Sequence, residues 1–364
     1  NITVNWEKVK KPTVESKVYT GQTLTANISE NGLYTVTENN GGTDVGEYNV
    51  QLTLTDSTNY RWEDGTVDTT VKFNITKATP VVTKPTTKTL TYNGSEQELV
   101  NAASTSGGTV KYSLDNQNWS TSIPTGKDAK EYTVYYKVEG NKNFKDADVQ
   151  EITNKINPRT IDLKWNNELT YNGKEQLPTA TVNNLADGDK CEVTVDGTQH
   201  KNVGTYKDAA KATKVNNQNY KLPENVTTSY TIKPKDITVT ITPNGGTYGE
   251  KITGATAKLN DVENGDHPKV TLTYTGTGYD GTIANGTEVP SHAGKYTVTA
   301  SITDENYKLT GTNTAEFVVK GANAGLKVKE VNDKKYGDQG FKLEVYHKGN
   351  GKLSYKRSNK DVAT

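Results

Sequence analysis

The stretch "AGKYTVTASITDENYKL", residues 293–309, decides the fold class. From Tyr296 to Ile302 every second side chain is apolar, and the side chains between them are Thr or Ser. This period of two predicts a β-strand with one buried and one solvated face. Asn306-Tyr307 follows shortly afterwards, and the spacing favours a strand, a tight hairpin and a second strand.

The same pattern recurs along the chain, which is the first thing to look for in a repetitive sequence. A small residue or turn leads to Tyr and an alternating run in "VGEYNVQLTL" (45–54), "AKEYTVYYKV" (129–138) and "VGTYKDAAKA" (203–212). The Asn-aromatic pairs are Asn59-Tyr60, Asn143-Phe144, Asn219-Tyr220 and Asn306-Tyr307. A Tyr that opens a late strand after a Gly turn is also typical of the tyrosine corner of immunoglobulin-like sandwiches.

A third recurring signal is a corner of Tyr and Gly. It reads "VYTGQTL" (18–24), "TYNGSEQ" (91–97), "TYNGKEQ" (170–176), "TYGEKI" (247–252) and "KYGDQG" (335–340), with the tyrosines Tyr19, Tyr92, Tyr171, Tyr248 and Tyr336. Asn and Gly tolerate positive φ, so the corner predicts a turn. We expect the Tyr ring to lie on the core edge with its hydroxyl near water. Because the fourth copy lacks Asn, we interpret the corner as structural and not as a ligand site.

Each repeat closes with a short apolar strand and a junction. Pro158 and Pro234 lie just past two of these strands, where proline ends a ladder and stiffens the link. The predicted modules are 1–78, 79–158, 159–234 and 235–320, followed by a truncated fifth module, 321–364.

The fold prediction is all-β: a tandem array of small Ig-like β-sandwich modules. Short strands with frequent turn signals, and no run at helical spacing, favour this architecture. β-grasp-like modules are the alternative, and they would need a helix.

Composition narrows the function classes. Lys plus Arg and Asp plus Glu both number 43, so the chain has no basic surface that would indicate nucleic acid or an anionic membrane as partner. The hydrophobic fraction of 31% is too low for one large core but suits several small ones. No stretch is long and apolar enough for a membrane span. The chain begins at Asn1 without a signal peptide, and we expect it to be a piece of a longer protein.

No catalytic, cofactor-binding or metal-ligating residues are predicted, and we expect no enzymatic activity. Cys191 is a single cysteine, and the four histidines share no metal-ligand spacing and are expected to be solvated turn residues. The acidic turns "ADGDK" (186–190) and "ENGDH" (263–267) leave calcium open as a minor alternative, although neither is an EF-hand. A Lys–Asn cross-link beside a buried acid is a second minor alternative.

Trp119, in "DNQNWSTSIP", is the one candidate ligand-binding residue. An aromatic side chain on a loop could stack on a sugar, and Tyr and Trp favour interfaces. Packing at a module edge is the competing interpretation.

These signals resemble the tandem Ig-like and MBG-type repeats of bacterial surface proteins, particularly large Gram-positive adhesins. The residues that carry the resemblance are "TYNGKEQ", "AGKYTVTASITDENYKL" and "KKYGDQGFKLEV" (334–345). The resemblance implies an extracellular, cell-surface location and a non-enzymatic stalk that projects a distal binding domain from the cell wall. The alternative is that the modules themselves bind a host glycan of mucin type, or a host or bacterial protein. In either case we expect a monomeric, elongated chain without cofactors.

Overall fold

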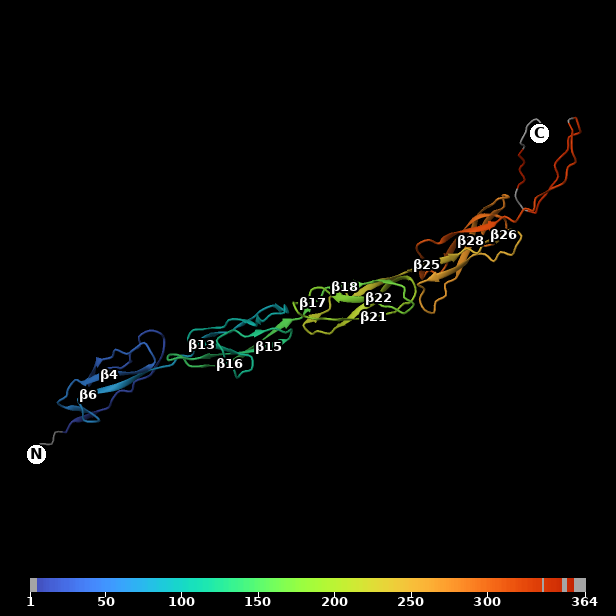
Figure 1. The fold of residues 1–364 in the computed structure, drawn as a ribbon. Coiled ribbons are helices and arrows are strands. Elements are labelled where there is room, and N and C mark those ends of the chain that lie inside the picture. The colour runs from blue at the N-terminus through green and yellow to red at the C-terminus, as the bar shows by residue number, and fades with distance from the viewer. Residues whose placement is uncertain (1–4, 336, 349–351, 357–364) are drawn as a thin grey trace. The chain divides into compact units, whose positions relative to one another are not determined.

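The computed structural model describes residues 5–335, 337–348 and 352–356, and these residues form strands, turns and loops (Figure 1). The fifth predicted corner tyrosine, Tyr336, lies outside the described residues. These ranges contain no helix, and therefore no helix able to cross a membrane. A β-grasp module requires a helix, so that alternative is wrong. The chain is an all-β tandem array of Ig-like β-sandwich modules, as predicted.

The chain divides into two compact units, each discontinuous in sequence. The first contains residues 1–162, 182–192 and 215–223, and the second contains residues 163–181, 193–214 and 224–364. The third predicted module contributes segments to both units. The module boundaries given above remain proposals, and the contacts described below all lie within one unit or the other.

One sheet topology recurs in the described part of the chain. In the first module, β2 (Lys17–Val18) pairs in parallel with β6 (Asp68–Thr76). Strand β6 pairs antiparallel with β4 (Gly46–Leu54), and β4 pairs antiparallel with β3 (Tyr34–Glu38). Figure 1 shows β4 and β6 side by side.

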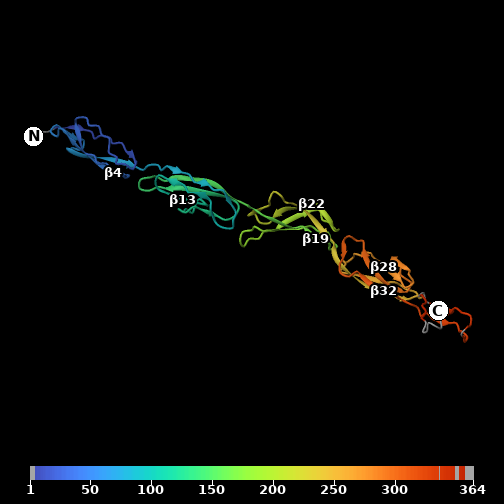
Figure 2. The same cartoon turned by 90° about the horizontal axis from the view of Figure 1, so that it is seen from above.

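The corresponding sheets of the next three modules have the same order. They are β9 (Leu90–Thr91), β16 (Ala147–Asn157), β15 (Glu131–Glu139) and β13 (Thr109–Ser113); β19 (Glu168–Thr170), β24 (Thr227–Lys233), β22 (Gly204–Val215) and β21 (Val193–Gly197); and β26 (Gly246–Thr247), β32 (Thr314–Lys320), β30 (Gly294–Ile302) and β28 (Val270–Gly278). The last of these sheets gains a fifth strand, β29 (Ile283–Gly286), and Figure 2 shows β28 and β32 of this sheet.

The strand that begins at the Asn-aromatic pair belongs to the other sheet. In the first module β5 (Tyr60–Trp62) pairs in parallel with β1 (Glu7–Val9). In the fourth module β31 (Tyr307–Leu309) pairs in parallel with β25 (Lys235–Thr242), which also pairs with β27 (Thr256–Asn260). The predicted tight hairpin is therefore wrong, because the aromatic strand crosses to the opposite layer and pairs with the first strand of its module.

The remaining strands are short. They are β7 (Val82–Thr83), β8 (Thr86–Thr87), β10 (Gln97–Glu98), β11 (Val100–Asn101), β12 (Ser104–Thr105), β14 (Thr125–Gly126), β17 (Arg159–Thr160), β18 (Leu163–Asn166), β20 (Thr179–Val182), β23 (Tyr220–Lys221), β33 (Lys327–Val328) and β34 (Val345–Tyr346).

The predicted alternation places the core between the layers. Val50 and Leu52 of β4 are fully buried, as is Trp62 of β5 from the opposite layer. In β30 the same spacing buries Tyr296 and Val298. Each module thus has the small core that its low hydrophobic fraction allows.

A single residue separates the last strand of one module from the first pairing residue of the next. Strand β16 ends at Asn157 and β17 begins at Arg159, and β24 ends at Lys233 and β25 begins at Lys235. In the first module β6 ends at Thr76, and Ala78 already bridges to Phe144. Links of one residue bring the ends of successive modules into direct contact.

Candidate functional site: the joints between modules

In the first four modules, the Tyr-Gly corner lies beside the end of the module's own last strand. The backbone N–H of the corner tyrosine donates to the carbonyl of the residue that ends this strand. The pairs are Tyr19 with Thr76, Tyr92 with Asn157, Tyr171 with Lys233 and Tyr248 with Lys320, at 2.8–2.9 Å. The corner is therefore held at the end of the module that faces its successor.

The glycine of the corner is needed for its backbone conformation and, in two copies, for space. Gly94 and Gly173 have φ of 85° and 74°, values that residues with a Cβ rarely adopt. A Cβ on Gly94 would lie 2.7 Å from the Cβ of Ala186, and one on Gly173 would lie 3.2 Å from that of Glu263. The turn prediction is confirmed, and these two corners also touch a residue of the following module.

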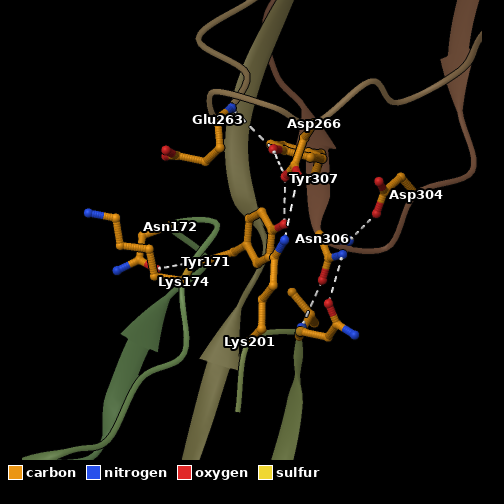
Figure 3. Close-up of polar contacts among 11 residues, drawn as sticks. Tyr171, Asn172, Lys174, Lys201, Glu263, Asp266, Asp304, Asn306 and Tyr307 are labelled. Carbon is orange, nitrogen blue, oxygen red and sulfur yellow. Dashed lines mark hydrogen bonds and ion pairs between the residues drawn. The ribbon is translucent and has the colours of Figure 1, made fainter. Parts of the chain in front are cut away.

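Two tyrosines and one carboxylate meet at the joint between the third and fourth modules (Figure 3). The rings of Tyr171 and Tyr307 lie edge to face with centroids 5.3 Å apart. Both hydroxyls donate to Oδ2 of Asp266, at 2.5 and 2.6 Å. Lys201 of the third module approaches the other carboxylate oxygen at 3.7 Å. We name this arrangement joint 3.

The joint between the second and third modules, joint 2, repeats this geometry. The Tyr92 and Tyr220 rings lie edge to face at 5.4 Å, and both hydroxyls donate to Asp189 Oδ2 at 2.7 and 2.6 Å. All four tyrosines of the two joints are at most 4% exposed. The expectation that the corner hydroxyl stays near water is wrong here, since the next module supplies its hydrogen-bond acceptor.

The carboxylates are placed by two equivalent β-turns. In joint 2 the turn runs from Ala186 to Asp189, and in joint 3 from Glu263 to Asp266, each closed by a backbone hydrogen bond of 3.0–3.1 Å. The N–H of the first turn residue donates to the hydroxyl of Tyr220 or Tyr307, at 2.8 and 3.1 Å. These hydroxyls therefore accept one hydrogen bond and donate another.

The asparagine before each aromatic residue fastens the second side of the joint. In joint 3 the side-chain oxygen of Asn306 accepts the N–H of Val203 at 2.9 Å, and its Nδ2 donates to Asn202 at 3.4 Å. In joint 2 Asn219 makes the same two contacts with Ala129 (2.7 Å) and Asp128 (3.1 Å).

Joint 1, between the first and second modules, keeps the asparagine, but no carboxylate accepts a hydrogen bond from its aromatic pair. Asn143 accepts from Val45 and donates to Asp44, both at 2.9 Å. Tyr19 meets Phe144 edge to face at 5.3 Å. Phe144 has no hydroxyl, and a Cβ on Gly107 would overlap the Phe144 ring. The acid turn thus occurs in the joints where the aromatic residue is Tyr.

The residues that receive the asparagine are positioned by a tyrosine corner. In the described chain Tyr48, Tyr132, Tyr206 and Tyr296 each donate a hydroxyl hydrogen bond to the carbonyl four residues earlier, at 2.6–3.0 Å. The acceptors are Asp44, Asp128, Asn202 and His292. This geometry confirms the tyrosine corners indicated by the sequence.

Burial and charge shift the pKa values of the joint groups in consistent directions. Burial first, and then the hydrogen bond to the carboxylate, raises the pKa of Tyr92 and of Tyr307 to about 12. Hydrogen bonds from Tyr220 and then Tyr92 lower the pKa of Asp189. Those from Tyr171 and then Tyr307 lower the pKa of Asp266. Joints 2 and 3 are thus most stable with neutral phenols and an ionised carboxylate.

The apolar core is continuous through joint 3. Tyr171 and Ile232 of the third module belong to one buried cluster with Ile237 and Tyr307 of the fourth. Such a contact resembles the interior of a domain more than a flexible linker.

Trp119, the predicted ligand-binding residue, is half-buried on the loop that follows β13. The Lys137 ammonium lies 4.4 Å from its ring centroid, a cation–π contact. The role of Trp119 in ligand binding stays a prediction.

The structure also places the residues considered for calcium binding and for a Lys–Asn cross-link. The two acidic turns, considered for calcium, supply Asp189 and Asp266 to the joints. Within the described ranges no group of three His, Cys, Asp or Glu side chains could hold a metal ion. Lys72 contacts Asn49 and Glu47, and Lys17 contacts Asn27. At the first of these pairs Lys72 and Glu47 are about half exposed, so the acid there is not buried as a cross-link requires. The cross-link stays a minor alternative.

Comparison with known proteins supports the module type. The family model of the MBG domain matches residues 253–323, which confirms the resemblance to MBG-type modules for this part of the chain. Among curated proteins, no sequence matches significantly.

Solved structures with similarity to the chain include Sidekick-1 immunoglobulin domains 1–5, at 14% identity and a TM-score of 0.23, covering 87% of this chain and 80% of that one. Another is SGBP-B of the Bacteroides ovatus mixed-linkage glucan utilization locus, in complex with a mixed-linkage heptasaccharide. It has 14% identity and a TM-score of 0.18, and covers 72% of this chain and 76% of that one. TM-scores this low support no functional inference.

Proposed function

We propose that this chain is a non-enzymatic spacer in a surface protein of adhesin type, in which the joints stiffen the connection between successive modules. The observation that carries the proposal is the threefold recurrence of one joint: a one-residue link, an edge-to-face aromatic pair and an asparagine that bonds to the preceding module. In a flexible array there would be no physical reason to bury tyrosines and a carboxylate between modules.

The cell-surface location and the Gram-positive wall are part of this proposal. The MBG domain at residues 253–323 supports a surface-associated, adhesin-like protein. A stalk that holds a distal binding domain away from the wall needs reach and stiffness, and short, packed junctions provide stiffness. We propose that the chain is a monomer, elongated in solution. Small-angle scattering measures this directly, and a compact particle would contradict it.

The sharper test measures the stiffness of joint 3. Spin labels at Lys211→Cys and Thr297→Cys, both exposed and on either side of the joint, in a Cys191→Ser background, report one distance across it. Pulsed electron resonance should give a single narrow distance distribution in the otherwise unchanged chain. The double variant Asn306→Ala, Tyr307→Ala should broaden it.

Glu305→Ala is the matched control for this test. Glu305 is exposed and lies next to Asn306 in the same loop. The distance distribution of the Glu305→Ala variant should stay narrow. A broad distribution in the chain with an intact joint would sink the spacer proposal, provided that circular dichroism shows folded modules.

The second candidate function is binding of a glycan or protein by the second module. Trp119 supports it, since a partly exposed aromatic ring on a loop can stack on a sugar. Lys137 already lies against this ring, so a sugar would use the other face or displace the ammonium. A glycan array with the intact chain and with Trp119→Ala tests this candidate, and equal signals from both proteins would remove Trp119 from it.

A further inference from the structure

The fourth module presents the same receiving parts at its end as the first three. Tyr248 donates its N–H to the carbonyl of Lys320 at 2.8 Å, and Gly249 has φ of 87°. Tyr296 donates its hydroxyl to the carbonyl of His292 at 2.8 Å. In joints 1, 2 and 3 the equivalent parts hold the next module.

His292 and Ala293 occupy the positions that bind the asparagine in the three joints. The side-chain oxygen of Asp44, Asp128 or Asn202 accepts the asparagine amide, and the next backbone N–H donates to the asparagine oxygen. His292 Nδ1 lies 2.6 Å from the Asp280 carboxylate. In the tautomer whose Nδ1–H donates to this carboxylate, Nε2 is an acceptor. In that tautomer the position has the same polarity as in the three joints.

The residue that follows the last strand of the fourth module also corresponds to the one-residue links of the three joints. Strand β32 ends at Lys320, and Gly321 stands where Lys77, Pro158 and Pro234 stand in the other three links. Residues 321–364 contain no Asn-aromatic pair. In the described part of this segment, Leu326, Val328 and Phe341 are more than half exposed.

We propose that Tyr248, Gly249, His292 and Ala293 form a receiving face that docks the Asn-aromatic loop of a further module of the same build, joined through Gly321. The inference rests on the proposed function of the joints and names the partner of the fourth module. The partner loop carries Asn followed by Tyr or Phe. Where the aromatic residue is Tyr, a turn ending in Gly-Asp accepts the hydroxyl of Tyr248 as Asp189 accepts that of Tyr92.

The test extends the chain by a module known to fit. Residues 1–321 are followed by a second copy of residues 159–234, so that the copied Asn219-Tyr220 loop and Asp189 turn can reach the face of the fourth module. Hydrogen–deuterium exchange then follows the peptides 247–254 and 290–296, which occur once in this protein. Exchange in both peptides should be at least tenfold slower than in the chain of residues 1–364.

Two variants separate docking from a general effect of extension. Asn219→Ala with Tyr220→Ala in the appended copy alone should remove the protection, and so should His292→Ala in the fourth module. Glu224→Ala in the appended copy, at an exposed position, should retain it. Unchanged exchange in the extended chain, or protection that survives the loop variant, would overturn the proposal.

Folding of the appended copy is checked in the same data. Peptides from 204–215 come from both copies, so a single isotopic envelope shows that both are folded. If the envelope is bimodal, residues 78–158 are appended instead, so that peptides 247–254 and 290–296 still occur once. Peptides from 131–139 then report the folding of both copies, and Asn143→Ala with Phe144→Ala is the loop variant. A narrow distance distribution across joint 3 together with unprotected 290–296 would refute the receiving face and leave the spacer proposal standing.

Discussion

The hydroxyls of Tyr171 and Tyr307, which belong to successive modules, donate to the same oxygen of Asp266 at 2.5 and 2.6 Å while their rings meet edge to face. A single carboxylate thereby satisfies two phenols that are almost fully buried. Hydrogen bonds to a charged acceptor are the stronger kind, and a buried hydroxyl without a partner is costly. Docking of the modules and satisfaction of these groups therefore depend on one another.

Replacement of Asp266 by Asn should loosen joint 3. The neutral amide accepts more weakly and directs two N–H groups toward donors, so we expect a loss of about 1–3 kcal/mol in local opening free energy. Hydrogen exchange at residues 259–266 measures this loss. Asp236→Asn, at an exposed position in β25, is the matched control and should change little. Equal effects of the two substitutions would contradict the role given to Asp266.

Acid should open joints 2 and 3 before the module cores unfold. The pKa values of Asp189 and Asp266 are lowered by their tyrosine hydrogen bonds, so the folded joint favours the carboxylate. Their contribution is complete above the ordinary aspartate pKa of about 3.9 and is lost as pH falls through the lowered values. Exchange protection of the Ala186–Asp189 and Glu263–Asp266 turns, measured against pH, should fall in that window. Joint 1 lacks the tyrosine-bonded carboxylate, but hydrogen bonds from Lys142 and then Asn143 across that joint lower the pKa of Asp44, so acid should also weaken joint 1.

High pH should also weaken joints 2 and 3, because it ionises their tyrosines. The pKa values of Tyr92 and Tyr307 are raised to about 12, so the folded joint favours the neutral phenols. This stabilisation is complete below the ordinary tyrosine pKa of about 10 and is lost as pH rises through about 12. Ultraviolet absorbance of tyrosinate should show a late-titrating group of phenols. In Tyr92→Phe, Tyr307→Phe this group should shrink, and an unchanged titration would count against the assignment.

The two corner glycines Gly94 and Gly249 should differ in tolerance to alanine. Both have φ near 85°, which costs a residue with a Cβ about 1–2 kcal/mol. At Gly94 the new Cβ would also lie 2.7 Å from that of Ala186, whereas at Gly249 no described atom lies within 4 Å. Urea unfolding should therefore show a larger loss for Gly94→Ala than for Gly249→Ala. Similar losses of unfolding free energy would mean that backbone strain alone, without the contact to Ala186, explains why glycine occupies position 94.

Much of the module architecture could be predicted from local pattern. The period of two in β4 and β30 identified the strands and their buried faces, and the Tyr-Gly corner identified a turn. The pairing of the Asn-aromatic strand could not be predicted this way, because its partner is the first strand of the module, far away in sequence. Short spacing favoured a hairpin, and the layered topology overrides it.

The joints were missed because each signal was interpreted within one module. Asp189 and Asp266 were considered as calcium ligands, since an acidic turn alone does not reveal its partners. The sequence holds a partial signal: a Gly-Asp turn occurs in the repeats of Tyr220 and Tyr307 and is absent from those of Phe144 and Tyr60. Because the repeat of Tyr60 has a phenol without the turn, comparison of the repeats suggests the pairing of carboxylate and phenol only for the third and fourth modules.

The one-residue links carry a consequence for how such chains change length. Every joint takes its parts from the same positions in each repeat, so a deletion that removes residues 159–234 leaves Tyr92 opposite Tyr307 and Asp266, and Asp128 opposite Asn306. Unequal recombination between neighbouring repeats can therefore shorten or lengthen the array in whole steps while every remaining contact surface finds a matching partner.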